Sequence, residues 1–174
     1  MKKGIINVVF YISVILLIVN VALLALNVAG VAYPVMGVSM QPKLYTGYIA
    51  FIQPVNISQL QVNKSIVVYY NPFYRELVIH HVVGRVNNGV IVQGFNKLTN
   101  PTPDMNFTSM EPLVVTQSMI RGVVVFYAPL FGFFILRPYS YIVLVFFLVM
   151  LVLKMIVDRK PAQKLKSTDN LTPP

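Results

Sequence analysis

The sequence predicts a mainly β domain held between two membrane-spanning helices. Two long apolar runs lie near the ends of the chain, and the segment between them alternates short Val-, Ile- and Tyr-rich runs with turn residues. The chain is 56% hydrophobic and 11% charged, whereas a soluble domain carries about 25% charged residues. These observations favour a membrane protein with a single domain of ordinary size outside the bilayer.

The first apolar run, residues 4–32, contains no charged residue. About 20 apolar residues span a bilayer core, so the run is long enough to be an N-terminal transmembrane anchor. A cleavable signal peptide is the alternative, because Lys2 and Lys3 precede the run and small residues end it. The run is longer than the apolar core of a typical signal peptide, which favours a retained anchor.

The second apolar run, residues 139–156, predicts a C-terminal transmembrane helix over 137–157. Lys154 lies near the end of the run, where a long basic side chain can reach the membrane interface. A hydrophobic hairpin or a buried amphipathic element is the alternative. Residues 158–174, which hold Pro, Lys, Ser and Thr, are expected to form a disordered cytoplasmic tail.

Basic residues flank both apolar runs and account for much of the net charge of +9. By the positive-inside rule, this placement predicts that both termini are cytoplasmic and that residues 33–136 face the other side. Between Pro34 and Leu136 there are only six basic residues against three acidic ones. The charge therefore does not form a basic stripe on the β domain, which disfavours nucleic-acid binding.

The middle segment, 33–136, is predicted to be the extracytoplasmic β domain. Its runs rich in Val, Ile and Tyr are residues 49–52, 65–70, 77–86, 89–94 and 120–127. The sequence Asn87-Asn88-Gly89 between two of them predicts a hairpin. The loop 95–112 is long, polar and proline-bearing, and long loops in compact domains are often functional.

Few side chains in this segment are chemically capable. His80 and His81 are the only histidines of the chain, and Glu76, Asp104 and Glu111 are the only carboxylates of the segment. The chain has no cysteine, which excludes a cysteine nucleophile and a thiolate metal site. Neighbouring strand residues point to opposite faces, so the two histidines cannot together bind one metal ion.

Nucleophilic catalysis by a serine is open to this set of side chains. A neutral imidazole can take a serine proton near neutral pH, and a carboxylate can orient the imidazole. The serines of the segment are Ser39, Ser58, Ser65, Ser109 and Ser118. Residue chemistry alone leaves open which serine, histidine and acid would act together, and a solvated serine or a structural histidine is the ordinary alternative.

Three segments in a fixed order reduce this choice. Residues 37–42 (GVSMQP) follow the first apolar run, residues 79–83 (IHHVV) lie in a predicted strand, and residues 100–104 (NPTPD) lie in the long loop. Together they resemble signal peptidase I of the archaeal and endoplasmic-reticulum type, which uses a serine and a histidine. That family has a small residue before Ser-Met-x-Pro, a strand Ile-His-Arg-Val-Val, and an acidic loop that ends in Asn-Pro-x-Pro-Asp.

The resemblance implies that Ser39 is the nucleophile, His80 the general base and Asp104 the acid that orients His80. It implies a signal-peptidase-like β domain and a membrane-bound serine endopeptidase that removes signal peptides from secreted preproteins. No cofactor and no metal are expected. The expected partners are signal-peptide-bearing preproteins and membrane lipid, with the protein translocation channel as a further candidate.

The chain departs from the family at several charged positions, and two strands of the form Gly-Asp-Ile-Val lack their acids at residues 47–50 and 64–67. His81 stands where relatives carry arginine, and Phe95 stands where they carry the aspartate of Gly-Asp. The missing acid keeps open an inactive signal-peptidase relative that acts as a membrane binding or assembly subunit. A membrane esterase that acts on lipid-linked substrates is a second alternative, because a Ser–His pair also serves that chemistry.

Overall fold

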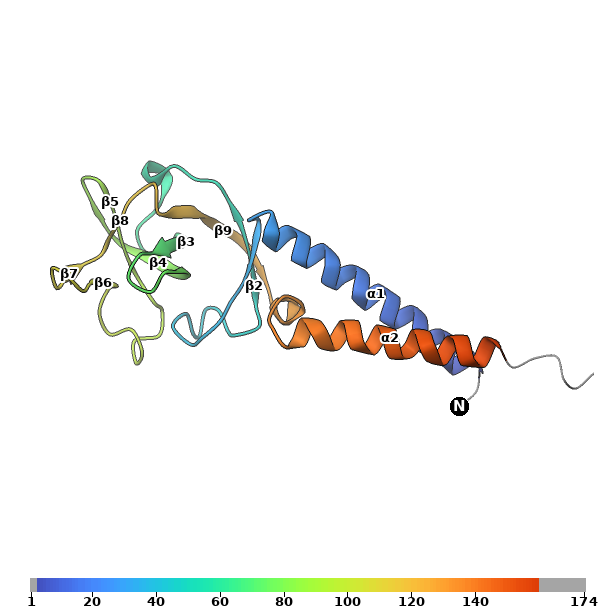
Figure 1. Cartoon of the computed structure of the whole chain (residues 1–174). Coiled ribbons are helices and arrows are strands. Elements are labelled where there is room, and N and C mark those ends of the chain that lie inside the picture. The colour runs from blue at the N-terminus through green and yellow to red at the C-terminus, as the bar shows by residue number, and fades with distance from the viewer. Residues whose placement is uncertain (1–2, 160–174) are drawn as a thin grey trace, which may run out of the picture.

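The computed structural model describes residues 3–159, and it combines a large antiparallel sheet with a long apolar helix towards each end of the chain (Figure 1). Helix α1 spans Lys3–Val28 and helix α2 spans Tyr139–Asp158. Both are long and apolar enough to cross a membrane. The predicted β domain between two apolar helices is confirmed at this level, its large sheet is antiparallel, and the fold as a whole is mixed α/β. The expected tail lies, beyond Arg159, outside the described residues.

Helix α1 ends before the apolar run does. The run 4–32 predicts a helix throughout, but Gly30 has a φ of +72°, and the side-chain amide of Asn27 donates to the Ala32 carbonyl at 2.8 Å. A left-handed glycine is a common way to end a helix. The chain then enters strand β1, Ala32–Pro34, so the helix passes directly into the sheet.

Seven strands form one sheet in the order β1-β2-β9-β3-β4-β5-β8. The strands that follow β1 in this sheet are β2 (Ile49–Gln53), β3 (Ile66–Asn71), β4 (Glu76–Val86), β5 (Gly89–Gln93), β8 (Val114–Val115) and β9 (Ile120–Ala128). The five predicted runs correspond to β2, β3, β4, β5 and β9. The predicted hairpin joins β4 to β5, where Val86 pairs with Gly89.

The long loop 95–112 contains a small hairpin of its own. It pairs β6 (Met105–Asn106) with β7 (Glu111–Pro112). Two short 3-10 turns complete the described elements, η1 (Ile57–Gln59) and η2 (Phe131–Phe134). Strands of two residues are too short to show alternation, so the sequence did not reveal β6, β7 or β8.

The described residues form three apolar clusters, and neighbouring residues of β3 contribute to two of them from opposite faces. The first cluster contains Leu60, Val67, Tyr69, Val82, Val90, Val92, Leu113 and Val115. The second contains Val35, Met40, Leu44, Ala50 and Ile66. Val67 pairs with His80, and Ile66 pairs with His81. Because neighbouring strand residues point to opposite faces, the two histidines lie on different sides of the sheet.

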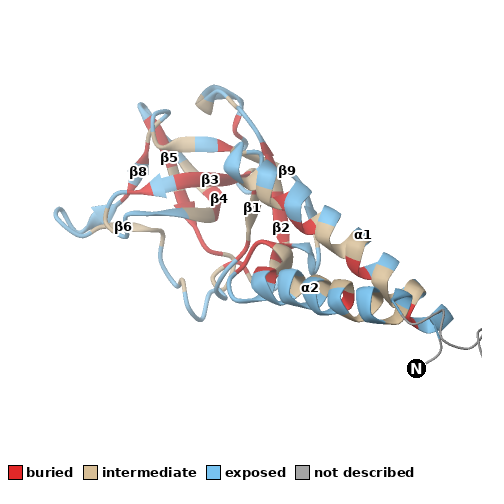
Figure 2. Cartoon of the chain, turned by 45° about the vertical axis from the view of Figure 1, so that its right-hand side comes forward, coloured by how far each residue is buried: buried red, intermediate tan, exposed pale blue. Residues whose placement is uncertain are grey.

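The two helices lie side by side, and the end of α2 meets the start of α1 (Figure 1). Lys3 Nζ lies 3.2 Å from Asp158 Oδ1. At the sheet end, the buried Asn20 donates its side-chain amide to the Phe134 carbonyl at 2.5 Å. Much of both helices is exposed (Figure 2), and the exposed residues are largely apolar. These features are consistent with a membrane location.

Candidate active site

His80 and Asp104 form a buried pair between β4 and the long loop. His80 Nδ1 lies 2.8 Å from Asp104 Oδ2, and each side chain is 6% exposed. The main chain holds the acid in place, since Asp104 N donates to the Val92 carbonyl at 3.0 Å and Leu113 N donates to the Asp104 carbonyl at 2.6 Å. The third predicted segment therefore reaches the histidine strand, as the resemblance implies.

The pairing decides which imidazole nitrogen is free. A carboxylate oxygen accepts hydrogen bonds, so the network assigns the proton of neutral His80 to Nδ1. Nε2 then carries a lone pair and can accept a proton from another group. A histidine held in this tautomer by a buried carboxylate is suited to general-base catalysis.

His81 is in a different environment, on the other side of the sheet. Its ring centroid lies 4.3 Å from that of Phe95. The residue is 8% exposed, and its Nδ1 is buried without a hydrogen-bond partner in the described part of the chain. Burial, helped by the charges of Lys97 and His80, lowers the pKa of His81 below its ordinary value. His81 is therefore a neutral side chain packed against an aromatic ring, and no carboxylate of the described residues orients it.

The loop 37–42 holds Ser39 between a tight turn and an apolar anchor. Gly37 has a φ of +79°, which favours glycine, although a Cβ there would meet no atom within 4 Å. Met40 is buried in the second cluster, and its carbonyl accepts from Leu44 N at 3.0 Å. Gly37 thus allows the chain to turn, and the buried Met40 side chain holds the loop against the domain. Ser39, between them, is half-buried at the surface.

The Ser39 loop contacts the chain at the end of β5, beside the position that faces His80. Asn96 N donates to the Ser39 carbonyl at 2.8 Å, and a Cβ added at Gly94 would lie 2.6 Å from the same carbonyl oxygen. His81 pairs with Gln93, so extending this register by one residue places Gly94 opposite His80. No hydrogen bond joins the Ser39 hydroxyl to His80 within residues 3–159. Catalytic hydrogen bonds often tighten only when substrate binds.

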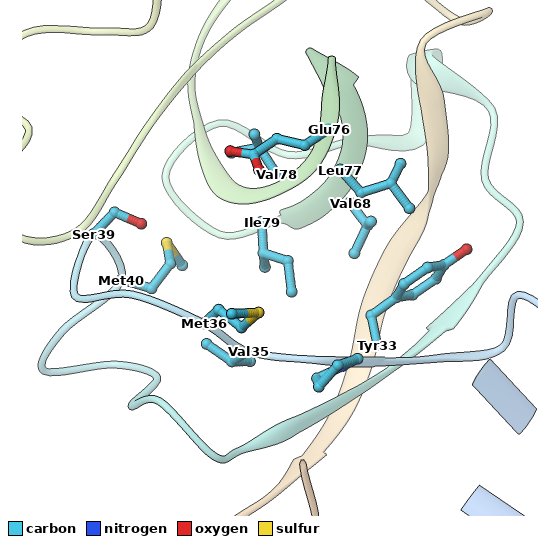
Figure 3. A pocket seen from close by; sticks show the side chains of 11 residues that line it. Tyr33, Val35, Met36, Ser39, Met40, Val68, Glu76, Leu77, Val78 and Ile79 are labelled. Atoms are coloured by element: carbon cyan, nitrogen blue, oxygen red, sulfur yellow. The ribbon is translucent and has the colours of Figure 1, made fainter. Parts of the chain in front are cut away.

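Ser39 stands at one end of a largely apolar cavity of about 210 Å³ (Figure 3). The cavity lies between the segment that follows β1 and the first half of β4. Its apolar lining includes Val35, Met36, Met40, Val68, Leu77 and Ile79. Glu76 is the one acidic residue that lines it. Of the three predicted catalytic residues, Ser39 is the one that lines this cavity.

Tyr69 is a site residue that sequence reasoning missed. It is fully buried in the first cluster, and its hydroxyl donates to Asp104 Oδ2. A tyrosine within a Val-rich strand looks like an ordinary core residue. The signal that could have found it is general, because a buried tyrosine hydroxyl usually has a hydrogen-bond partner. Of the other acids, Glu111 is exposed and makes no contact with the pair.

Comparison with protein-family models and with curated proteins finds no match for this chain. The functional argument therefore depends on the ordered segments and on the geometry described above. His81 and Phe95, which replace two charged residues of the resembling family, are in contact with each other through their rings.

Proposed function

We propose that the chain is a membrane-bound serine endopeptidase that removes signal peptides, with Ser39 as nucleophile and His80 as general base. The observation that carries the proposal is the buried His80–Asp104 pair, held beside the Ser39 loop at the end of an apolar cavity. A nucleophile, a base and an orienting carboxylate are the groups that acyl transfer requires.

The proposed reaction begins when Ser39 Oγ attacks the scissile carbonyl while His80 Nε2 takes the hydroxyl proton. His80 then gives that proton to the leaving amine, and an acyl-enzyme remains on Ser39. A water molecule attacks the acyl group, again with His80 as base, and releases the serine. Asp104 stabilises the imidazolium that forms in both halves of the reaction.

The main chain of the Ser39 loop offers donors for the developing oxyanion. Neither Ser39 N nor Met40 N donates to another group of the described residues. A free amide beside the nucleophile is suited to stabilise a tetrahedral intermediate. We assign this role to one or both of these amides.

The cavity supports a peptide substrate in extended form. It lies between a chain segment and β4, and a peptide can pair with a sheet edge while its alternate side chains enter pockets. The apolar lining fits small uncharged side chains before the cleaved bond. Preproteins with an apolar signal helix would present such a sequence where they leave the bilayer, near membrane lipid and the translocation channel.

The proposed topology places both termini in the cytoplasm and the sheet on the opposite side. The ion pair between Lys3 and Asp158 brings the outer ends of the helices together. Lys3 and Arg159 therefore belong to one end of the helix pair, where the positive-inside rule favours the cytoplasm.

The contact between His81 and Phe95 supports an active enzyme. The family's arginine and aspartate are replaced at two positions that touch each other, so the loss of one charge accompanies the loss of the other. The pair that orients the base, His80 with Asp104, is separate from this contact. The acid missing at position 95 is thus not needed to hold His80.

An inactive relative that binds a partner in the membrane is the second candidate. The observation that favours it is the Ser39 hydroxyl, which makes no hydrogen bond to His80 within the described residues. Such a subunit would keep the fold and the cavity without cleaving a peptide.

Cleavage of a synthetic preprotein in detergent or lipid separates these functions. The intact chain is expected to cut after a small residue, and Ser39→Ala and His80→Ala are expected to reduce cleavage to background. Asp104→Asn should lower kcat on the order of 10³- to 10⁴-fold. Ser109→Ala, at an exposed serine in the turn between β6 and β7, is the matched control and should retain full activity. Cleavage by Ser39→Ala would remove the proposed nucleophile, and a folded but inert parent would favour the binding subunit.

A further inference from the structure

Tyr69 is buried next to the proposed catalytic pair. It lies on β3, is 0% exposed, and belongs to the first apolar cluster with Val67 and Val82. Its hydroxyl donates to Asp104 Oδ2, the same oxygen that His80 Nδ1 contacts at 2.8 Å. Two donors from neighbouring strands therefore meet on one carboxylate oxygen. Hydrogen bonds to an ionised acceptor are stronger than neutral ones, so both help to fix the carboxylate.

Asn71, two residues along β3, orients the tyrosine hydroxyl. Its Oδ1 accepts from Phe73 N at 2.9 Å and from Tyr74 N at 3.3 Å. These two backbone donors identify which side-chain atom of Asn71 is the oxygen. The NH₂ group therefore faces Tyr69, whose hydroxyl oxygen lies 3.4 Å from Nδ2. The hydroxyl accepts from Asn71, and its own proton points to Asp104.

The tyrosine is a permanent donor in this arrangement. Burial, together with the negative charge of Asp104, raises the pKa of Tyr69 well above its ordinary value. The phenol therefore stays protonated over the pH range in which a peptidase works. Asp104 itself is held by main-chain hydrogen bonds on its other side, to Val92 and Leu113.

We propose that Tyr69, oriented by Asn71, is a positioning residue that holds the Asp104 carboxylate against His80. The inference rests on the proposed serine–histidine peptidase. It adds Tyr69 and Asn71 to the His80–Asp104 pair as residues that orient the general base. The chain of hydrogen bonds starts at the turn after β3 and ends at the imidazole. As a second oriented donor, the Tyr69 hydroxyl fixes the Asp104 carboxylate, which a charged side chain would do in a more polar site.

The test is Tyr69→Phe, which removes only the hydroxyl, with Tyr70→Phe as matched control. Tyr70 is the next residue of β3, is exposed, and points to the opposite face. Cleavage of the synthetic preprotein by Tyr69→Phe should show kcat lowered about 10- to 100-fold and KM changed by less than about twofold. Tyr70→Phe should match the parent.

The pH profile distinguishes positioning from a general loss of structure. Without the tyrosine hydroxyl, the Asp104 carboxylate is no longer fixed against His80, so it stabilises the imidazolium less. The acid limb of the Tyr69→Phe profile should therefore move to lower pH. His81 and Tyr74 are the other titratable groups near this network, and neither changes in the variant. Tyr69→Phe should also cause little further loss when Asp104→Asn is already present.

Two outcomes would overturn the positioning role. One is a Tyr69→Phe variant with the parent's kcat and pH profile. The other is a loss of kcat that follows a loss of melting temperature and adds fully to that of Asp104→Asn. In either case, an active parent with an inactive Ser39→Ala variant leaves the proposed function intact.

A measurement without substrate covers the case in which the parent does not cleave. The chain has two histidines, so a ¹⁵N spectrum can be assigned with His81→Gln. The parent should show His80 protonated on Nδ1 with a slowly exchanging proton, and Tyr69→Phe should exchange that proton faster. Identical tautomer and exchange in the two proteins would refute the positioning role, whatever the activity.

Discussion

His81 and Phe95 contact each other through aromatic rings and not through opposite charges. Their ring centroids lie 4.3 Å apart with the ring planes tilted by 40°, at the two positions where the resembling family carries arginine and aspartate. Because the two side chains touch, each sets the environment of the other. A change at only one position should therefore cost more than a change at both.

Restoring the charged pair tests this coupling. Phe95→Asp alone should lower the melting temperature, because the variant loses the contact between the two rings and its carboxylate meets a neutral imidazole instead of a cation. His81→Arg with Phe95→Asp should recover stability, with a coupling of about 1 kcal/mol in a double-mutant cycle of thermal or denaturant unfolding. The double variant should also cleave the synthetic preprotein, since His80 and Asp104 are untouched. Additive effects of the two substitutions would show that the positions are independent.

The same histidine gives the domain a pH-dependent stability. The pKa of His81 is lower in the folded chain than in the unfolded one, mainly because the side chain is buried. As the pH falls through about 6.5, the unfolded chain binds the proton first. The contribution of His81 is therefore complete above that pH and is lost as the pH falls below it.

His81→Phe removes this titration and keeps an aromatic partner for Phe95. In melting experiments from about pH 7 to about pH 5, the parent should lose more melting temperature than His81→Phe. Parallel curves for the two proteins would contradict the burial argument for this side chain.

At the scale of elements, the sequence predicted what depends on regular patterning. Alternation and composition located β2, β3, β4, β5 and β9, and apolar length located both helices. The same alternation correctly separated His80 from His81. The end of α1 at Val28 depends on the conformation of Gly30 and on the contact of Asn27 with Ala32, which no periodicity encodes.

The residues of the candidate site also fall into two groups, those that local sequence predicts and those that only the fold brings together. Ser39, His80 and Asp104 were selected by an ordered set of local segments, and the structure brings the last two together. Tyr69 joins them through a contact across 35 residues of sequence. That contact needs the register of β3 with β4 and the path of the long loop, and both are properties of the folded chain.

At the scale of the whole molecule, α1 and α2 lie side by side with the large sheet at one end, and their ends away from the sheet are in contact (Figure 1). Lys3 and Lys154 both bind Asp158, at 3.2 and 3.1 Å, and Lys154 also donates to Asn7 at 3.2 Å. These polar contacts lie at the end of the helix pair opposite the sheet (Figure 1). A bilayer around the apolar surfaces would therefore separate this end from the candidate site.

The absence of cysteine from the chain makes that separation directly measurable. Ser109→Cys places a thiol on an exposed turn of the β domain, and Arg159→Cys places one at the exposed end of α2. In sealed right-side-out vesicles, a membrane-impermeant maleimide should label Ser109→Cys at once and Arg159→Cys only after the membrane is opened. The basic residues that remain beside position 159, among them Lys160, still favour a cytoplasmic end. Labelling of both thiols in sealed vesicles would mean that the helices do not cross the bilayer as a pair, and the reverse pattern would place the site with its serine in the cytoplasm, where no signal peptide emerges.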